Sequence, residues 1–501
     1  MPIVSFTFLL LVAVTALACR FLSICRPYVL LVSSLLFYLS YGPAFLPFIL
    51  VTAFTVYAGA RLIERQKRAG LEKRAKAVLL AVLILNVGIL VAGKALNLIF
   101  SVTGAGTLEK YVIIPLGVSY YTFSAVGYLL DVNWGRCAAE RDPFRFLLFV
   151  CYFPHIIEGP ISRYDLLGAS LREPRTLDHD GLSHGLSLML WGYFKKLLIA
   201  NRLAPFVSDV FGSTQGFGAM YLAALAADVV MLYADFSGYM DIMRGVSELF
   251  GVTLEKNFDH PFFSGSVSEF WRRWHISLGT WFKDYVYMPL SMSAPMVGLY
   301  AKLSKAKNRR FAKNVTTVLS LMTVWILTGL WHGTGTGYLL WGVYYGTVIA
   351  VSVIFEKDFK KLNKKLGIGP DDPWINTLRI FRTWLAFAFG RLLTKGACFG
   401  DAAAIIGRIF TNFRLSQLFV RAQVTSHCVT ASSLALSLLF TGVLFAVSLI
   451  ETKRGEDIQS LLGKRGTAIR WTLLILGVAL VLFFGVIDTT NGAAGFAYQQ
   501  F

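Results

Sequence analysis

The tetrapeptide LWHG at residues 330–333 lies inside a mostly apolar run from Val324 to Tyr345. His332 is the only ionisable side chain in this run before Tyr338. A titratable group at membrane depth is costly, so it usually faces a protein interior or a water-filled cavity and has a function there. The glycine-rich stretch 333–337 predicts that the helix loosens after the histidine, which is tolerated only where backbone lines a cavity or is buried. We therefore expect His332 in a pocket wall. A structural histidine, hydrogen-bonded to a neighbouring helix, is the alternative.

The composition indicates a membrane protein. The chain has 501 residues, of which 55% are hydrophobic and 15% charged, whereas a soluble domain carries roughly 25% charged residues. Segments close to the ~20 apolar residues that span a bilayer fall at about 3–18, 27–60 with a break at Gly42-Pro43, 77–100, 111–130, 182–200, 219–234, 315–331, 337–355, 376–393, 432–450 and 470–487. They predict an all-α polytopic protein with roughly ten to twelve transmembrane helices, built as a single membrane domain over residues 1–501.

The basic residues predict the topology. The formal net charge is +19, but the basic side chains cluster in short loops at 61–76, 302–313, 357–365 and 453–470. Short loops rich in lysine and arginine stay in the cytoplasm. We therefore expect these loops, and by alternation residues 20–26 and 136–145, to be cytoplasmic, with the amino terminus outside. This distribution favours the lipid bilayer as the partner and argues against nucleic acid.

Two stretches in the first third of the chain suit helix packing and an irregular loop. IPLGVSYYTF at 114–123 opens a predicted span with a proline near the helix start, followed by small residues that let helices approach closely. YFPH at 152–155 continues to EGP at 158–160, and its prolines disfavour a regular span. We expect a re-entrant or interfacial loop there, in which His155 and Glu158 either line a substrate path or lie at the headgroup level.

The stretch YADFSGYMD at 233–241 places two carboxylates close to apolar sequence. Asp241 and Arg244 are three residues apart, so they are able to form an ion pair across one helical turn. Asp235 has no such partner nearby in the sequence. It is therefore a candidate for orienting another polar group along a substrate path.

The stretch FWRRWHISL at 270–278 alternates aromatic and basic residues. On a continuous helix, Trp271, Trp274 and His275 share one apolar stripe, which predicts a helix lying in the membrane interface with its histidine pointing inward. The separation of His275 from His332 matches no local metal-ligand pattern such as His-Glu-x-x-His. The six cysteines include no Cys-x-x-Cys pair, so we expect no metal site.

The stretch FAYQQF at 496–501 forms an aromatic-rich tail. Tyrosine often anchors a chain at the membrane interface, and anchoring is one interpretation of Tyr498. The other interpretation depends on the family resemblance described next.

Together these stretches resemble the membrane-bound O-acyltransferase (MBOAT) family. The resemblance rests on FWRRWH at 270–275 through YMP at 287–289, LWHG at 330–333, DFSGY at 235–239 and PLGVSYYTF at 115–123. It covers about residues 110–346 and is specific as a set. Within the family, the chain is most similar to the bacterial branch that includes the alginate O-acetyltransferase membrane subunit and the teichoic acid D-alanine transferase.

Two further segments bear on that branch. The tail at 496–501 is similar to the terminal motif of polysaccharide acylation systems, where the tyrosine is thought to carry the acyl group. The alginate-type members usually show a Trp-x-x-Phe-Arg-Ala segment near the later spans. Here the nearest match is WLAFAF at 384–389, with the arginine displaced to Arg391.

The resemblance implies a central funnel of membrane-spanning, re-entrant and interfacial helices in a bacterial cytoplasmic-membrane enzyme. The enzyme would move an acyl group, most simply acetyl, from a cytoplasmic thioester (acetyl-CoA or an acyl carrier protein) towards hydroxyls of a cell-surface polysaccharide. The resemblance also implies an extracytoplasmic esterase-like acetyltransferase as partner.

The residues suit this chemistry, because a positioned base is worth ~10²–10⁴-fold in such transfers and imidazole titrates near neutral pH. We expect His332 to act as the base and His275 to polarise the thioester carbonyl or orient the acceptor. Trp331 is a candidate for the substrate path, and Tyr498 is a candidate acyl relay.

Other functions stay open at this point. D-alanyl transfer to teichoic acid, or acylation of a lipid or small alcohol, would use the same residues. A transporter would show similar broken helices and buried polar groups. Transporters often carry weak internal repeats, however, and we find none in this chain.

Overall fold

The computed structural model describes residues 1–103, 115–173, 179–333, 335–369, 372–395, 399–419 and 430–487. Within these ranges the regular structure is helical, and the β-structure consists of one isolated bridge between Phe258 and Trp274. The all-α fold predicted from composition is confirmed. The tail at 496–501, with Tyr498, lies outside the described residues.

Seven of the described helices are long and apolar enough to cross a membrane. They are α3 (Leu46–Arg68, which the 3₁₀ turn η2 at Pro43–Phe45 precedes), α4 (Glu72–Thr103), α12 (Gly218–Leu249), α17 (Arg309–His332), α18 (Thr336–Ile354), α23 (Ala431–Arg454) and α25 (Thr467–Phe484). The pair α1 (Phe6–Phe21) and α2 (Arg26–Leu39), bent by 117° at the turn η1 (Ser23–Cys25), makes an eighth if it counts as one span. The chain is therefore a multi-pass membrane protein.

This number is below the roughly ten to twelve spans that apolar length alone predicts. The segment around 111–130 yields the helix α6 (Val118–Asn133), which has 16 residues. The segment 376–393 lies in α20 (Pro373–Leu393), which carries three arginines. The break expected at Gly42-Pro43 is present, because α2 ends at Leu39 and η2 begins at Pro43.

The chain forms two compact units. Unit 1 comprises Met1–Arg202, Leu232–Lys256 and Leu436–Gln500. Of the third range, the structure describes residues 436–487. Unit 2 comprises Leu203–Met231 and Asn257–Ala435. The long helix α12 begins in unit 2 and ends in unit 1.

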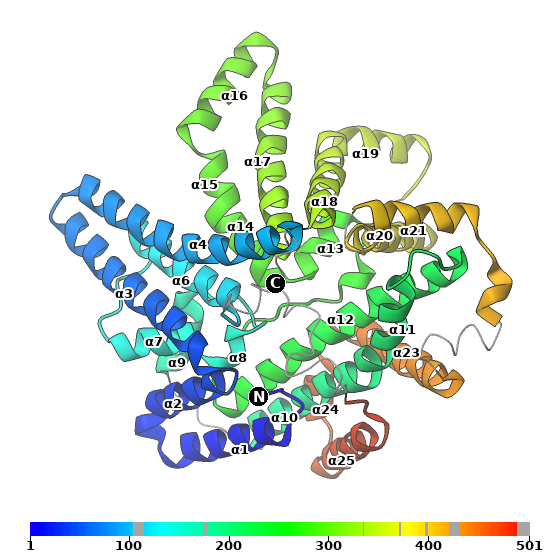
Figure 1. Cartoon of the computed structure of the whole chain (residues 1–501), viewed down its shortest axis with the longest axis horizontal. Coiled ribbons are helices and arrows are strands. Elements are labelled where there is room, and N and C mark those ends of the chain that lie inside the picture. Colours follow the sequence, from blue (N-terminus) through cyan, green and yellow to red (C-terminus); the bar gives the residue numbers. More distant parts are fainter. Residues whose placement is uncertain are drawn as a thin grey trace. The chain divides into compact units, whose positions relative to one another are not determined.

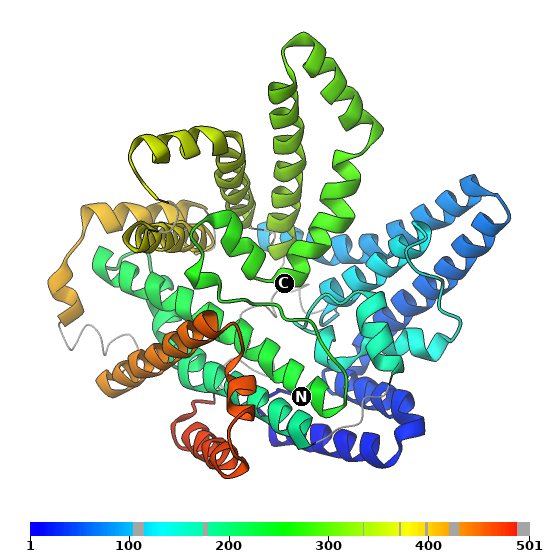
Figure 2. The same cartoon turned by 180° about the vertical axis from the view of Figure 1, so that it is seen from behind.

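Unit 1 is built from α1–α4 and α6, followed by short helices and the C-terminal helices. These further elements are α7 (Pro143–Cys151), α8 (Phe153–Ile156), the π-helix η3 (Tyr164–Gly168), α9 (Ala169–Arg172), α10 (His179–Tyr193), the π-helix η4 (Phe194–Ala200), the second half of α12, most of α23, α24 (Ile458–Gly463) and α25. The red helices α24 and α25 pack against α10 (Figure 2). As predicted, the stretch after α7 is not a regular span, because α8 has only four residues.

Two glycine pairs bring α10 and α12 unusually close in unit 1. A Cβ on Gly192 would lie 2.6 Å from the carbonyl oxygen of Gly238, and a Cβ on Gly245 would lie 2.5 Å from that of Gly185. Small residues at such positions let membrane helices approach backbone to backbone. The approach places the π-helix η4, which continues α10, directly against α12.

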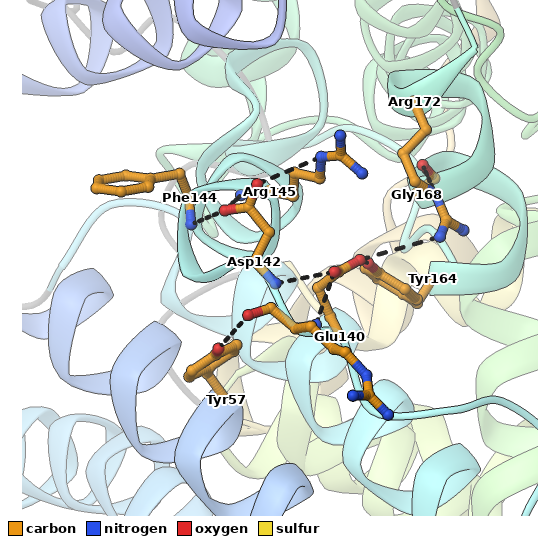
Figure 3. A network of polar contacts seen from close by, with 9 residues as sticks. Tyr57, Glu140, Asp142, Phe144, Arg145, Tyr164, Gly168 and Arg172 are labelled. Carbon is orange, nitrogen blue, oxygen red and sulfur yellow. Dashed lines mark hydrogen bonds and ion pairs between the residues drawn. The ribbon is translucent and has the colours of Figure 1, made fainter.

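A polar network also holds the predicted cytoplasmic loop at 136–145 in unit 1 (Figure 3). Glu140 Oε1 accepts hydrogen bonds from the backbone nitrogens of Arg141 at 2.7 Å and Asp142 at 3.0 Å. The Tyr164 hydroxyl donates to the same carboxylate, and Arg172 lies 4.0 Å from it. These bonds hold the pKa of Glu140 below its usual value, although burial acts in the opposite direction. The loop is thereby anchored to η3 and α9.

Unit 2 begins with most of α11 (Asn201–Phe211) and the first half of α12. Its later elements are the turn η5 (Pro261–Phe263), α13 (Val267–Arg273), α14 (Ile276–Phe282), the π-helix η6 (Lys283–Tyr287), α15 (Met288–Ser291), α16 (Ala294–Ala306), α17, α18, α19 (Glu356–Lys365), α20, α21 (Phe399–Thr411) and the turn η7 (Leu415–Phe419). Helix α17 packs along α16 on one side and α18 on the other (Figure 1).

Candidate active site

His332 is the last residue of α17. The helix starts at an Asn308 cap, whose side chain accepts from the backbone nitrogen of Phe311 at 2.8 Å, and it stops at Gly333. A Cβ on Gly333 would lie 2.3 Å from the ring of Tyr338, so only glycine fits there without a shift. The predicted loosening of the helix directly after the histidine is confirmed.

Aromatic rings surround the His332 imidazole. Its centroid lies 4.7 Å from that of Trp331 and 4.8 Å from that of Trp341, both edge-on at 71°. Trp341 in turn contacts Trp325 and Tyr345, at centroid distances of 5.7 and 5.0 Å. The histidine is 5% exposed. Ring packing of this kind restricts the orientation of the imidazole and keeps water away from most of its surface.

His275 occupies a break between two helices. The continuous helix predicted through 270–278, with its shared stripe, is wrong, because α13 ends at Arg273 and α14 begins at Ile276. His275 has φ 47° and ψ 54°, the left-handed conformation that is strained for a residue with a Cβ. The backbone nitrogen of Ile276 donates to the carbonyl of Asn257 at 3.0 Å and helps to hold this conformation. Strained residues of this kind cluster at functional sites.

The surroundings of His275 keep its imidazole neutral. Its Nδ1 lies 3.5 Å from Asn257 Oδ1, which also accepts from the backbone nitrogen of Ser277 at 2.8 Å. Burial lowers the pKa of His275 to about 3. At any cellular pH this side chain is therefore an uncharged hydrogen-bonding group.

Trp331 links the two histidines. Its ring centroid lies 4.7 Å from that of His332 and 6.1 Å from that of His275. All three residues are buried in unit 2. The structure thus brings His275 next to Trp331 and His332, which are adjacent in the sequence. Their chemical roles stay predictions.

The remaining candidates that the structure describes, His155, Glu158 and Asp235, belong to unit 1. His155 is fully buried, and its Nε2 lies 2.8 Å from the carbonyl oxygen of Phe149. Burial lowers the pKa of His155 to about 4. Glu158 is buried as well. Both lie in the protein interior, and their place on a substrate path or at the headgroup level stays a prediction.

Asp235 has a partner that sequence reasoning missed. It forms a buried ion pair with Lys196 of the π-helix η4. The adjacent Lys195 donates to Asp241 Oδ2 at 2.5 Å and to Ser237 at 3.0 Å. The predicted pair of Asp241 with Arg244 is present at 3.7 Å. Lys195 and Lys196, two consecutive lysines inside an apolar segment, were the sequence feature that indicated buried carboxylate partners. The pairing with Lys196 favours a structural role for Asp235.

Unit 2 contains a second buried charge cluster that sequence reasoning missed. Asp228 of α12 is completely buried and accepts from Arg391 at 2.8 and 3.1 Å and from Lys395 at 2.7 Å. The arginine noted above as displaced from its usual motif position is one member of this cluster. A lone carboxylate in the predicted span 219–234 was the available signal.

Comparison with known proteins defines the class. Residues 139–387 match the model of the MBOAT, membrane-bound O-acyltransferase family. The probable alginate O-acetylase AlgI of Pseudomonas syringae pv. tomato is 32% identical over 405 residues, which cover 78% of this chain and 72% of the relative. The chain belongs to the membrane-bound O-acyltransferase family.

Two other relatives represent the two kinds of protein in the bacterial branch that the sequence resembles. The probable alginate O-acetylase AlgI of Pseudomonas putida is 33% identical over 338 residues, 66% of this chain and 63% of the relative. The teichoic acid D-alanyltransferase of Bacillus subtilis is 30% identical over 287 residues, 56% of this chain and 68% of the relative. The chain thus spans less than two thirds of the first of these proteins. Membership of this family argues against the alternative that the chain is a transporter.

Proposed function

We propose that this protein takes an acetyl group from a thioester on the cytoplasmic side of a bacterial cytoplasmic membrane and delivers it towards hydroxyls of a cell-surface polysaccharide. The observation that carries the proposal is the placement of both His275 and His332 next to Trp331 in the interior of unit 2. The similarity to two proteins named as probable alginate O-acetylases supports acetyl as the acyl group.

The two histidines have different tasks in this proposal. The His332 imidazole takes the proton of the attacking hydroxyl, whose oxygen forms a bond to the thioester carbonyl carbon. The carbon–sulfur bond breaks, and the departing thiolate receives the proton from the imidazolium. His275 stays neutral, since burial lowers its pKa to about 3. It donates a hydrogen bond that polarises the carbonyl or orients the acceptor.

The donor is acetyl-CoA or an acetylated carrier protein, and the final acceptor requires a partner outside the membrane. An extracytoplasmic esterase-like acetyltransferase would take the acetyl group from an ester on Tyr498. A phenolic ester suits this step, because the phenol, with a pKa of ~10, leaves more easily than an alkoxide.

D-alanyl transfer is the second candidate function. It is favoured by one observation, the 30% identity to a protein named as a teichoic acid D-alanyltransferase. The site chemistry is the same for both acyl groups, so the acyl group itself has to be identified.

The test is to delete the gene in its host and to measure the ester-linked groups that mild alkali releases from the cell-surface polymer. Wild-type protein should restore acetate release, whereas His332→Ala at equal membrane abundance should not. Release of D-alanine instead of acetate would replace the acetyl proposal by the second candidate. Release of neither group in any strain would contradict the proposed function.

Tyr498→Phe tests the relay separately, because it keeps the ring and removes the oxygen. The relay requires loss of polymer acetylation with the membrane protein still abundant. Near-normal acetylation would mean that Tyr498 only anchors the tail. Abundance is followed by immunoblot of the membrane fraction, with Phe496→Leu as a control that leaves the phenol in place.

A further inference from the structure

Arg26 is a buried arginine at the amino-terminal end of α2. It follows the short turn η1, at the 117° bend between α1 and α2, and it is only 3% exposed. All three of its side-chain nitrogens, Nε, Nη1 and Nη2, are buried and have no hydrogen-bond partner among the described residues. A guanidinium is always charged in proteins. A buried charge without a counter-charge is strongly unfavourable.

Other arginines of unit 1 do have carboxylate partners, even where solvent reaches them. The pairs include Arg68 with Glu64 at 3.1 Å, Arg136 with Asp131 at 3.1 Å, Arg163 with Asp165 at 3.1 Å and the buried Arg470 with Asp180 at 2.8 Å. The absence of a partner at Arg26 is therefore not a general feature of this unit.

The groups close to Arg26 are neutral. Cys19 and Tyr152 are near enough to interact with it electrostatically. The Tyr152 hydroxyl already donates to Ser247 at 3.0 Å. The helix dipole of α2 adds partial positive charge at this end, although the Arg26 N–H already donates to the carbonyl of Ser23 and Pro27 has no N–H. The helix end and the guanidinium thus both favour an anion.

The surface next to Arg26 is apolar. Phe21 is 79% and Ile24 93% exposed, and both lie in the bend that precedes it. The distribution of basic loops predicts that residues 20–26 face the cytoplasm. Phosphate groups occur there on the headgroups of inner-leaflet lipids and on thioester donors such as CoA. Exposed apolar side chains beside a cationic site suit the acyl chains and the headgroup of a phospholipid.

We propose that Arg26 and the amino terminus of α2 bind a phosphate group on the cytoplasmic side. The fork of guanidinium N–H donors matches phosphate oxygens in pairs, which a point charge does not. A phospholipid headgroup and the phosphate of a CoA-type donor share this chemistry. Only the donor version rests on the proposed function, since lipid binding at this site is independent of acyl transfer.

The experiment measures thermal unfolding of the purified full-length protein in dodecyl maltoside, a detergent without phosphate. Dioleoylphosphatidylglycerol is the lipid probe, with dioleoylglycerol as its phosphate-free match. CoA is the donor probe, with pantetheine as its phosphate-free match. The proteins are wild type, Arg26→Gln and the control Arg20→Gln, which removes an exposed arginine from the neighbouring helix α1.

A phosphate site requires that the wild type is stabilised by one phosphate-containing probe and not by its match. Arg26→Gln should weaken the affinity for that probe about tenfold or more, while Arg20→Gln keeps it. A shift with phosphatidylglycerol identifies a lipid site, and a shift with CoA a donor site. Equal shifts in wild type and Arg26→Gln would overturn the proposal. So would a wild type that responds to neither probe while Arg26→Gln is the more stable protein.

A second measurement keeps the proposal testable if Arg26→Gln does not fold. Arg26→Lys retains the charge but loses the paired donors, so it should bind the phosphate probe more weakly than wild type. Native mass spectrometry of wild-type protein should also show a bound phosphate-containing molecule. Undiminished binding in Arg26→Lys, with no such molecule on the wild type, would reject the site. Neither readout depends on acyl transfer, so this failure is separate from a failure of the proposed function.

Discussion

The contact between η4 and α12 in unit 1 and the junction of α17 and α18 in unit 2 both place ionisable side chains within apolar helices. In unit 1, Lys196 and Lys195 are each matched by a carboxylate of α12. In unit 2, His332 and His275 lie against the indole of Trp331. The first arrangement neutralises permanent charges. The second holds neutral imidazoles, of which His332 is the proposed proton acceptor.

This difference distinguishes side chains that stabilise the fold from side chains that are able to take part in a reaction. A paired lysine and carboxylate joins two helices and has no free capacity for a reaction. An imidazole in an apolar setting is tolerated because its neutral form carries no charge, and it still takes up a proton when a reaction supplies one. The proposed function therefore places the reaction in unit 2, and we expect the pairs of η4 and α12 to contribute to stability.

The largest expected effect is on acyl transfer in His332→Ala. Removing the base should lower the transfer rate by ~10²–10⁴-fold, while the protein inserts and folds as before. The rate is measured with labelled acetyl thioester and normalised to folded protein from size-exclusion chromatography. Acyl transfer at the wild-type rate in this variant would contradict the role of His332 in unit 2 as the base.

Lys196→Met tests the unit 1 side. It leaves the Asp235 carboxylate buried without its partner, which costs about 3–5 kcal/mol and should lower the unfolding midpoint and the membrane abundance. Lys196→Met combined with Asp235→Asn removes both charges and should recover most of the loss. A single variant as stable as wild type would mean that this pair does not hold η4 to α12.

A smaller effect is expected for His275→Ala. Since burial lowers the pKa of His275 to about 3, its contribution is one neutral hydrogen bond, worth about tenfold in rate. His275→Asn retains a donor and should lose less. Between pH 5 and pH 8, roughly the range in which unperturbed histidines titrate, the transfer rate should show no step from His275. Loss of protein abundance alone would make His275 structural.

A still smaller effect is expected from His184 of α10, which contacts Glu248 at 2.6 Å and Asp457 at 3.7 Å. Hydrogen bonds to Asp457 and Glu248 raise the pKa of His184 to about 9. Its stabilising contribution is therefore complete below the unfolded pKa of ~6.5 and is lost as pH rises through about 9. The unfolding midpoint of wild type should fall over that range, and His184→Gln should remove this fall. An unchanged pH dependence of the unfolding midpoint in His184→Gln would show that His184 does not contribute to it.

The predicted topology is tested with introduced cysteines, for which we expect no effect on stability or transfer rate. Cysteines introduced in the loops at 61–76 and 302–313 should resist membrane-impermeant labels applied from outside, because both loops are predicted to be cytoplasmic. Labelling after the membrane is permeabilised is the control. Strong labelling of either loop in intact cells would reverse the topology, including the side assigned to Arg26.

Much of the fold follows from local features of the sequence. The end of α17 at His332 follows from an apolar run that meets glycine, and the break at Gly42-Pro43 follows from backbone that cannot continue a helix. The irregular stretch after α7 follows from its prolines in the same way. In each case the cause lies within a few residues of the effect.

The features that were missed depend on contacts between distant residues. The left-handed conformation of His275 is held by Asn257, on a preceding segment, so helical periodicity around 270–278 was misleading. Asp235 seemed to lack a partner because Lys196 lies on another helix. Fewer of the described helices qualify as spans than apolar length predicts, because apolar length does not reveal which helices are short or charged.

The most direct test of the division between the two units compares two variants in one assay. His332→Gln and the double variant Lys196→Met/Asp235→Asn are purified, and transfer of labelled acetyl from the thioester is measured per folded molecule. The account predicts that His332→Gln loses transfer while keeping wild-type stability, and that the double variant keeps transfer. Transfer that survives in His332→Gln but is lost in the folded double variant would contradict it.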